Sequence, residues 1–123
     1  MLELLLDADG LLAVHKPAGL LVHPSRMDAH EHDTLLTRAE AQFGQRLHPL
    51  HRLDKGTSGL LLLARDSATA ARAGAWFRDG LVSKHYLALV RGWPAADAGL
   101  IDHPLARDPE RPSQGQPQLE AQT

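Results

Sequence analysis

The stretch His51-Arg52-Leu53-Asp54-Lys55-Gly56-Thr57-Ser58-Gly59-Leu60-Leu61-Leu62-Leu63-Ala64 joins a polar loop bracketed by two glycines to a run of apolar residues. The apolar run, residues 60–64, has the length of a buried strand. The loop before it holds an aspartate between two cations, Arg52 and Lys55, which favour the ionised form of Asp54. Such a loop between extended segments is a good place for a nucleophilic or acid–base carboxylate.

The same loop has a simpler interpretation, a polar hairpin loop with a surface salt bridge, because short motifs often occur by chance. A phosphate-binding P-loop fits poorly, since the Walker pattern needs an earlier glycine and a different residue order. If the loop is functional, Gly56 and Gly59 let its backbone approach a bulky ligand closely. The hydroxyls of Thr57 and Ser58 are then expected to orient the carboxylate of Asp54.

The residues on the N-terminal side of this loop predict a hairpin. Two short apolar runs, residues 2–6 and 11–15, flank the turn-forming sequence Asp7-Ala8-Asp9-Gly10. The sequence Lys16-Pro17-Ala18-Gly19 then ends the second strand, because proline has no N–H to donate. Residues 20–23 are expected to be another short extended piece.

Two helices are predicted, one before the loop and one after it. Thr34 is expected to cap a helix that places Leu35, Leu36, Ala39 and Phe43 on one face and closes at Gly44. Asp66 or Ser67 is expected to cap a second helix that ends at Asp79-Gly80. Its apolar face is expected to carry Ala70, Ala73, Phe77 and Leu81.

The last predicted strand covers residues 82–90, where Tyr86, Ala88 and Val90 alternate with His85, Leu87 and Leu89. The order of elements predicts an α+β fold with a mixed, largely antiparallel sheet flanked by helices, over residues 1–106. Residues 107–123 contain three prolines and almost no apolar side chain, so they are expected to form a polar loop or tail.

Composition narrows the class of protein. With 123 residues, 43% of them hydrophobic and 23% charged, the chain predicts one ordinary globular domain. The absence of cysteine excludes disulfides, thiol nucleophiles and cysteine zinc sites. No apolar run is long enough to cross a bilayer and the start does not resemble a signal peptide, so a cytoplasmic protein without a membrane partner is expected.

The net charge of −2 means that any RNA binding must come from a local basic patch. The eight histidines raise the possibility of a metal site, and the tightest pairs are His30-x-His32 and His48-x-x-His51. Neither pair has an obvious third ligand, so no metal and no cofactor are expected.

Three ordered segments resemble the RluA family of pseudouridine synthases. The loop of residues 51–59 with the apolar run after it resembles the family signature. The segment Val14-His15-Lys16-Pro17-Ala18-Gly19 resembles the N-terminal NKPxG turn, with His15 where asparagine is usual. The segment Lys84-His85-Tyr86-Leu87-Ala88-Leu89-Val90-Arg91-Gly92 resembles the second motif. The three segments are spread over residues 14–92 of the chain.

The resemblance implies an RNA uridine-to-pseudouridine isomerase that needs no cofactor. Asp54 then corresponds to the catalytic aspartate, Arg52 helps to displace the target nucleotide, and Tyr86 packs on the target base. His51 is expected either to orient Asp54 or to contact RNA, and the basic side chains nearby, Arg65 included, are expected to contact phosphates. The residues predicted to bind substrate or RNA are Arg52, Tyr86, His51, Lys55, Thr57, Lys84 and Lys16.

Two further segments, Val90-Arg91-Gly92-Trp93 and Leu100-Ile101-Asp102-His103-Pro104-Leu105, resemble the TruC-like branch of that family. That branch modifies a uridine in the acceptor stem of tRNA, so tRNA is the expected partner and a monomer the expected state. The alternatives are an rRNA substrate, a non-catalytic RNA-binding module, and a degenerate product without function.

One family feature has no counterpart here. The family's third motif, near a Gly-Arg-x-His-Gln-x-Arg sequence, supplies a basic residue that pairs with the catalytic aspartate, and no stretch of this chain matches it. The chain is therefore expected to be the N-terminal half of a catalytic domain, inactive alone, with Asp54 lacking that charge partner. Strands without neighbours are expected to leave apolar edges exposed.

Overall fold

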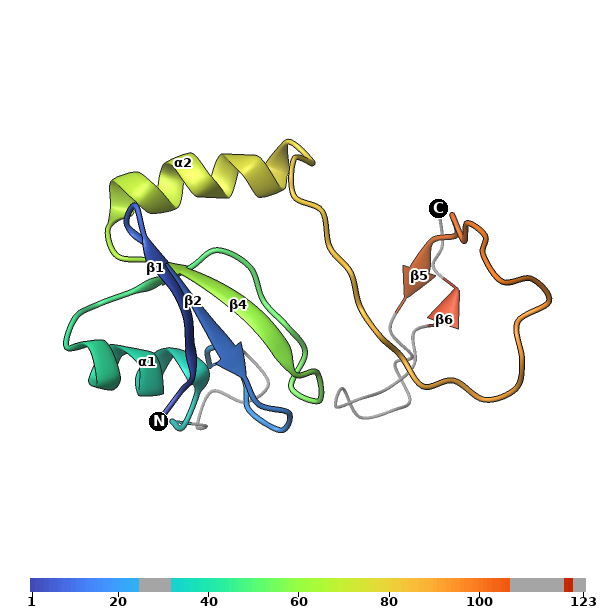
Figure 1. The fold of residues 1–123 in the computed structure, drawn as a ribbon, viewed down its shortest axis with the longest axis horizontal. Helices are drawn as coiled ribbons and strands as arrows, with labels where there is room; N and C mark the ends of the chain where they lie inside the picture. Colours follow the sequence, from blue (N-terminus) through green and yellow to red (C-terminus); the bar gives the residue numbers. More distant parts are fainter. Residues whose placement is uncertain (25–31, 107–118, 121–123) are drawn as a thin grey trace. The chain divides into compact units, whose positions relative to one another are not determined.

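The computed structural model describes residues 1–24, 32–106 and 119–120, which fall into two units, Met1–Val82 and Ser83–Thr123. The first unit holds a four-stranded sheet in the order β1-β2-β4-β3 and two helices (Figure 1). Its elements are β1 Leu4–Ala8, β2 Leu11–Lys16, α1 Leu35–Phe43, β3 His48–Pro49, β4 Gly59–Ala64 and α2 Ser67–Arg78. All of its strand pairings are antiparallel, so the predicted α+β class is confirmed.

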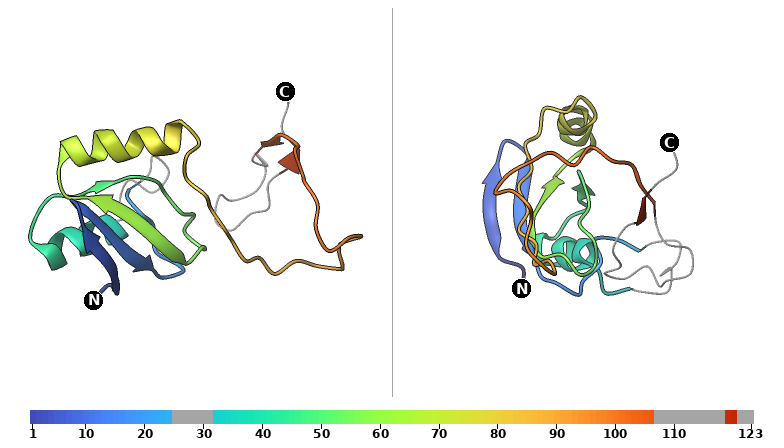
Figure 2. Two further views of the ribbon diagram at one scale, coloured as in Figure 1. Left: turned by 45° about the horizontal axis from the view of Figure 1, so that its top comes forward. Right: turned by 90° about the vertical axis from the view of Figure 1, so that its right-hand side faces the viewer.

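The predicted hairpin is present, with a tighter turn than expected. Ala8 pairs with Leu11, so the turn is limited to Asp9 and Gly10, whose φ angles are 55° and 80°. Two positive φ angles are typical of a type I′ turn, which matches the twist of the flanking strands. Strand β1 lies at the edge of the sheet (Figures 1 and 2). All of its side chains are exposed.

The pairing register of β2 and β4 determines which of their side chains lie in the hydrophobic core. Leu12 pairs with Leu63 and Val14 with Leu61, so these side chains lie on the same face of β2 and β4, and all are fully buried. They form one cluster with residues of α1, Leu35 among them. Helix α2 packs against β3 and β4.

Both helices begin where the sequence predicts. The hydroxyl of Thr34 accepts a hydrogen bond from the N–H of Thr37, and α1 closes at Gly44 in the left-handed conformation. The carboxylate of Asp66 caps α2 by accepting a 2.7 Å hydrogen bond from the N–H of Thr69. Leu81 lies beyond the end of α2 and is exposed, so it is not part of the apolar face as predicted.

The extended piece predicted at residues 20–23 is not a strand. Its carbonyl groups bind helix α1 instead: Leu21 accepts from the N–H of Leu35 at 2.7 Å, and Val22 accepts from the N–H of Leu36 at 2.9 Å. The first N–H groups of a helix have no partner within it. The segment therefore supplies acceptors to a helix rather than pairing in the sheet.

The strand predicted at residues 82–90 is also wrong. This part of the chain has no strand assignment, and the side chains of Tyr86, Leu87 and Leu89 are exposed. An alternating pattern produces a strand only where another strand is present to pair with it. The strands described in the second unit are β5 Leu105–Ala106 and β6 Leu119–Glu120, which pair antiparallel.

The predicted tail of residues 107–123 lies outside the described residues, apart from Leu119–Glu120. Among the residues that the structure describes, no helix is long and apolar enough to cross a membrane.

Candidate active site

Asp54 lies in the loop between β3 and β4, and its side chain is exposed. The residue before it, Leu53, is buried in the core cluster and anchors the loop to the sheet. The N–H of Thr57 donates a 3.0 Å hydrogen bond to the carbonyl of Asp54, which closes a turn with Lys55 and Gly56 at its corner. The contact between Thr57 and Asp54 is thus a backbone one, whereas the sequence predicted a hydroxyl contact.

The side chain of Lys16 binds the backbone of this loop. Its side chain is fully buried, and its Nζ donates hydrogen bonds to the carbonyls of Thr57 at 2.7 Å, Pro17 at 3.0 Å and Lys55 at 3.1 Å. Three acceptors use all three hydrogens of an ammonium group. The prediction that Lys16 contacts an RNA phosphate is therefore wrong for this structure, because the ammonium group is buried and already bonded.

The charge of Lys16 is also coupled to Asp54. Burial lowers the pKa of Lys16 below its ordinary value, since a charged group loses hydration inside a protein. The negative charge of Asp54 acts in the opposite direction and raises that pKa. Lys16 is thus a buried cation within electrostatic reach of Asp54.

The turn after β2 is tied to the same loop. The N–H of Gly19 donates a 2.7 Å hydrogen bond to the carbonyl of Lys55, the carbonyl that also accepts from Lys16. Gly19 has a φ of +88°, a conformation that side-chain-bearing residues rarely adopt. The glycine of the NKPxG-like segment therefore lets this turn lie against the loop of Asp54.

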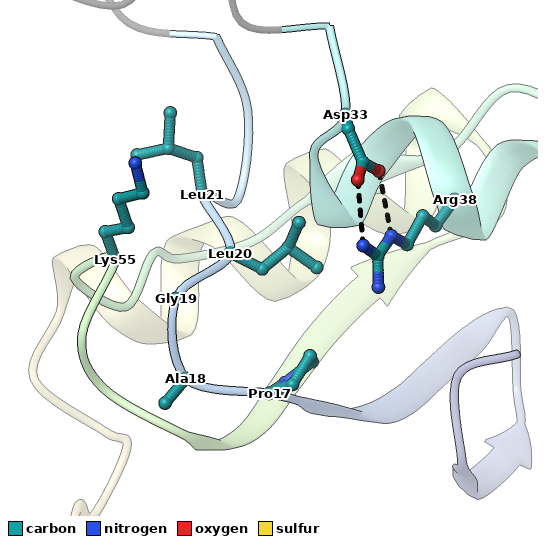
Figure 3. Close-up of a pocket in the computed structure, with 8 residues that line it drawn as sticks. All are labelled: Pro17, Ala18, Gly19, Leu20, Leu21, Asp33, Arg38 and Lys55. Atoms are coloured by element: carbon teal, nitrogen blue, oxygen red, sulfur yellow. Dashed lines mark hydrogen bonds and ion pairs between the residues drawn. The ribbon is translucent and has the colours of Figure 1, made fainter.

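A hollow of about 290 Å³ lies beside the loop (Figure 3). Its cationic groups come from two elements, Lys55 from the loop and Arg38 from α1. Arg38 makes a bidentate ion pair with Asp33, with both N–O distances 2.8 Å, and this pair lowers the pKa of the Asp33 carboxyl. The lining residues are Pro17, Ala18, Gly19, Leu20, Leu21, Asp33, Arg38 and Lys55.

His51 contacts two neighbouring elements of the protein, β4 and α2. The N–H of Leu62 in β4 donates a 3.0 Å hydrogen bond to its Nε2, and the ring stacks on Phe77 of α2 with 5.1 Å between centroids. These contacts hold the ring of His51 in place, and both roles predicted for this residue stay predictions.

The other residues predicted to contact RNA lie in the Asp54 loop, at the end of β4 and in the second unit. Arg52 is exposed next to Asp54, and its role in displacing a nucleotide stays a prediction. Arg65 follows the far end of β4 and binds Asp7 at 2.9 Å and the side chain of Gln45, so it secures the sheet and is not beside the loop. Lys84 and Tyr86 belong to the second unit, where both are exposed. Among the described residues, no three histidine or acidic side chains form a group that could hold a metal ion.

The sequence profile of the RNA pseudouridylate synthases matches residues 10–123. The chain belongs to the RNA pseudouridylate synthase family. The matched range includes both the turn of Gly19 and the loop of Asp54.

Individual members of the family are similar over most of the chain. The tRNA pseudouridine synthase C of Vibrio cholerae is 42% identical over 88% of this chain and 44% of its own length. The enzyme of the same name from Pasteurella multocida is 45% identical over 85% of this chain and 42% of its own length. This pseudouridylate synthase chain thus spans less than half the length of these relatives.

A solved structure, Human RNA Pseudouridylate Synthase Domain Containing 4, is 34% identical to this pseudouridylate synthase chain, with a TM-score of 0.48. The match covers 63% of this chain and 30% of the human chain.

Proposed function

We propose that the protein carrying this sequence isomerises uridine to pseudouridine in tRNA, with Asp54 as its catalytic carboxylate. The observation that carries the proposal is the exposed Asp54, held on a loop by the buried Lys16, in a member of the RNA pseudouridylate synthase family. Relatives that are 40–45% identical are named tRNA pseudouridine synthase C, which favours tRNA over rRNA.

The chemistry fits a lone, positioned carboxylate. The C1′–N1 bond of uridine breaks, a C1′–C5 bond forms, C5 loses its proton and N1 gains one, so the reaction is a balanced isomerisation. A carboxylate serves such a reaction as a nucleophile or by stabilising the positive charge that develops on the sugar. No electron transfer is involved, in keeping with our proposal that no cofactor takes part.

The RNA contacts are assigned to exposed and half-buried polar residues. The target nucleotide must leave its stack before the bond to the sugar can be reached. Arg52 is exposed beside Asp54 and is assigned to displacing that nucleotide, while the ring of Tyr86 offers a stacking surface. Lys55, Thr57 and Lys84 complete the proposed RNA-binding set, in a monomeric protein of the cytoplasm.

Tritium release from tRNA that carries 5-tritiated uridine tests the proposal directly. The natural protein carrying this sequence is expected to release tritium, and the Asp54→Asn variant is expected to release none. Asp97→Asn is the matched control, because Asp97 is an exposed aspartate of the second unit. Undiminished release from Asp54→Asn would show that another group performs the chemistry.

Trapping with tRNA that contains 5-fluorouridine separates an enzyme from a binding module. An enzyme is expected to form a stable adduct with this tRNA. Salt-sensitive binding without an adduct would instead identify a non-catalytic RNA-binding protein.

A further inference from the structure

We infer that His51 is a positioning residue: its imidazole replaces a backbone acceptor at the end of the β3–β4 ladder and so directs the chain into the loop of Asp54. The inference rests on the proposed function only in taking Asp54 as the catalytic carboxylate. Its structural part concerns three described residues, His51, Leu62 and Phe77.

The ladder between β3 and β4 changes partner at His51. His48 pairs with Ala64 and Pro49 with Leu63, which brings Leu50 opposite Leu62. The N–H of Leu50 donates a 3.0 Å hydrogen bond to the carbonyl of Leu62, as an antiparallel pair requires. In a regular ladder the N–H of Leu62 would return that bond to the carbonyl of Leu50.

The N–H of Leu62 binds His51 instead, at 3.0 Å from Nε2. A backbone N–H can only donate, so Nε2 must be the unprotonated acceptor and the ring proton of the neutral imidazole must be on Nδ1. The ring thus satisfies a strand N–H while the main chain of residues 51–53 leaves the sheet.

Stacking fixes the direction of the ring. The imidazole of His51 lies against the ring of Phe77 in α2, with 5.1 Å between centroids and 18° between planes. Offset stacking at this separation is favourable for aromatic pairs. Strand β4 and helix α2 therefore hold the same side chain, one through a hydrogen bond and the other through the ring face.

The loop is consequently held at both ends. His51 anchors the chain three residues before Asp54, and the bond from Lys16 to the carbonyl of Thr57 anchors it three residues after. Arg52 and Asp54 lie between these anchors with exposed side chains. Release of the His51 anchor would let the carboxylate of Asp54 move.

Two substitutions test the acceptor nitrogen of His51 and its aromatic ring separately. His51→Gln keeps an acceptor oxygen at about the reach of Nε2 but loses the ring, whereas His51→Phe keeps a stacking ring but has no acceptor. His48→Phe is the matched control, because His48 lies in β3, three residues before His51, with an exposed side chain. The measurements are the amide exchange rate of Leu62, the ¹⁵N spectrum of His51, and kcat and KM of the natural protein.

We expect the Leu62 amide to exchange roughly tenfold to a hundredfold faster in His51→Phe, because a partly buried donor loses its partner. The kcat of this variant should fall by roughly the same factor with little change in KM, since a displaced catalytic group costs that much. His51→Gln should recover most of both effects, and His48→Phe should show neither.

The inference is overturned if wild-type Nε2 carries the proton, or if His51→Phe leaves Leu62 exchange or kcat unchanged. If His51→Phe does not fold, two measurements still test the inference. These are the ¹⁵N spectrum of His51 in the wild-type protein and the Leu62 exchange rate and kcat of His51→Gln. An inactive wild-type protein with the expected exchange rates would refute the proposed function but not the structural role of His51.

Discussion

The ammonium group of Lys16 donates a 2.7 Å hydrogen bond to the carbonyl of Thr57, so the last residue of β2 supports the loop that carries Asp54. The same group also binds the carbonyls of Pro17 and Lys55. One buried side chain therefore joins the turn after β2 to the candidate catalytic loop.

Lys16→Met is expected to lower the free energy of unfolding by about 2–4 kcal/mol, because three backbone carbonyls lose a charged donor. Urea denaturation followed by circular dichroism measures the change. Arg46→Met, at an exposed position after α1, is the control and should change stability by less than about 0.5 kcal/mol. Equal stability of the two variants would mean that the carbonyls find other partners.

The stability of the protein is expected to depend on Lys16 in the alkaline range. Burial lowers the pKa of Lys16 in the folded state, so between that pKa and the ordinary value of lysine the unfolded chain binds more protons. The free energy of unfolding should therefore rise with pH through this window. Asp54→Asn should extend the window to lower pH, because the charge of Asp54 raises the pKa of Lys16.

Urea titrations at a series of pH values from neutral to alkaline measure how the free energy of unfolding changes with pH. Lys16→Met serves as the reference, because it lacks the titrating group. If the free energy of unfolding changes with pH in the same way for the wild-type protein and Lys16→Met, Lys16 is not the group responsible.

Gly10→Ala is expected to destabilise the fold by more than the left-handed backbone alone explains. A Cβ at Gly10 would lie 2.7 Å from Oγ1 of Thr69, and the φ of Gly10 is +80°. The backbone term is about 1–2 kcal/mol, and the clash adds to it. Gly44→Ala is the matched control, since its φ is +68° and a Cβ there meets no atom within 4 Å.

Thermal or urea unfolding of both glycine variants provides the comparison. Thr69→Ala combined with Gly10→Ala should recover the clash term in a double-mutant cycle. Equal losses for Gly10→Ala and Gly44→Ala would show that Thr69 moves away without cost.

Lys55→Gln is expected to weaken tRNA binding and to reduce its dependence on salt. Lys55 lies next to Asp54 and lines the hollow shared with Arg38 (Figure 3). Loss of one phosphate contact should reduce the slope of log K against log salt concentration by about 0.7–0.9. Filter binding at several salt concentrations measures the slope, with the exposed Arg72→Gln of α2 as the control. An unchanged slope would place Lys55 outside the RNA interface.

Local chemistry made much of the fold predictable. The Asp9-Gly10 turn and the caps Thr34 and Asp66 each depend on neighbouring residues only, and each is found where the sequence predicts it. The strand after Gly59 is also found where the apolar run predicts it, and both β2 and β3 are present to pair with it. The strand expected at residues 82–90 depends on a distant partner, which a local pattern cannot supply.

The site was predictable in its exposed part and not in its buried part. Arg52 and Asp54 are exposed polar residues in a glycine-bracketed loop, which is a local signal. Lysine is rarely buried unless it is paired, so the sequence favoured a surface role for Lys16. Two of its partners are the carbonyl groups of Lys55 and Thr57, about 40 residues away. Every residue has a backbone carbonyl, so the sequence does not indicate which carbonyls will bind a lysine.

The register of the sheet has a consequence for the order of folding. Strands β3 and β4 are close in sequence, whereas β2 pairs with β4 across more than 40 residues. Closing the shorter loop costs less entropy, so the hairpin that contains Asp54 is expected to form before β2 docks. Lys16 arrives only with β2, so the loop that carries Asp54 is expected to be anchored late in folding. Pulse-labelled amide exchange would reveal this order as earlier protection of Leu50 than of Val14.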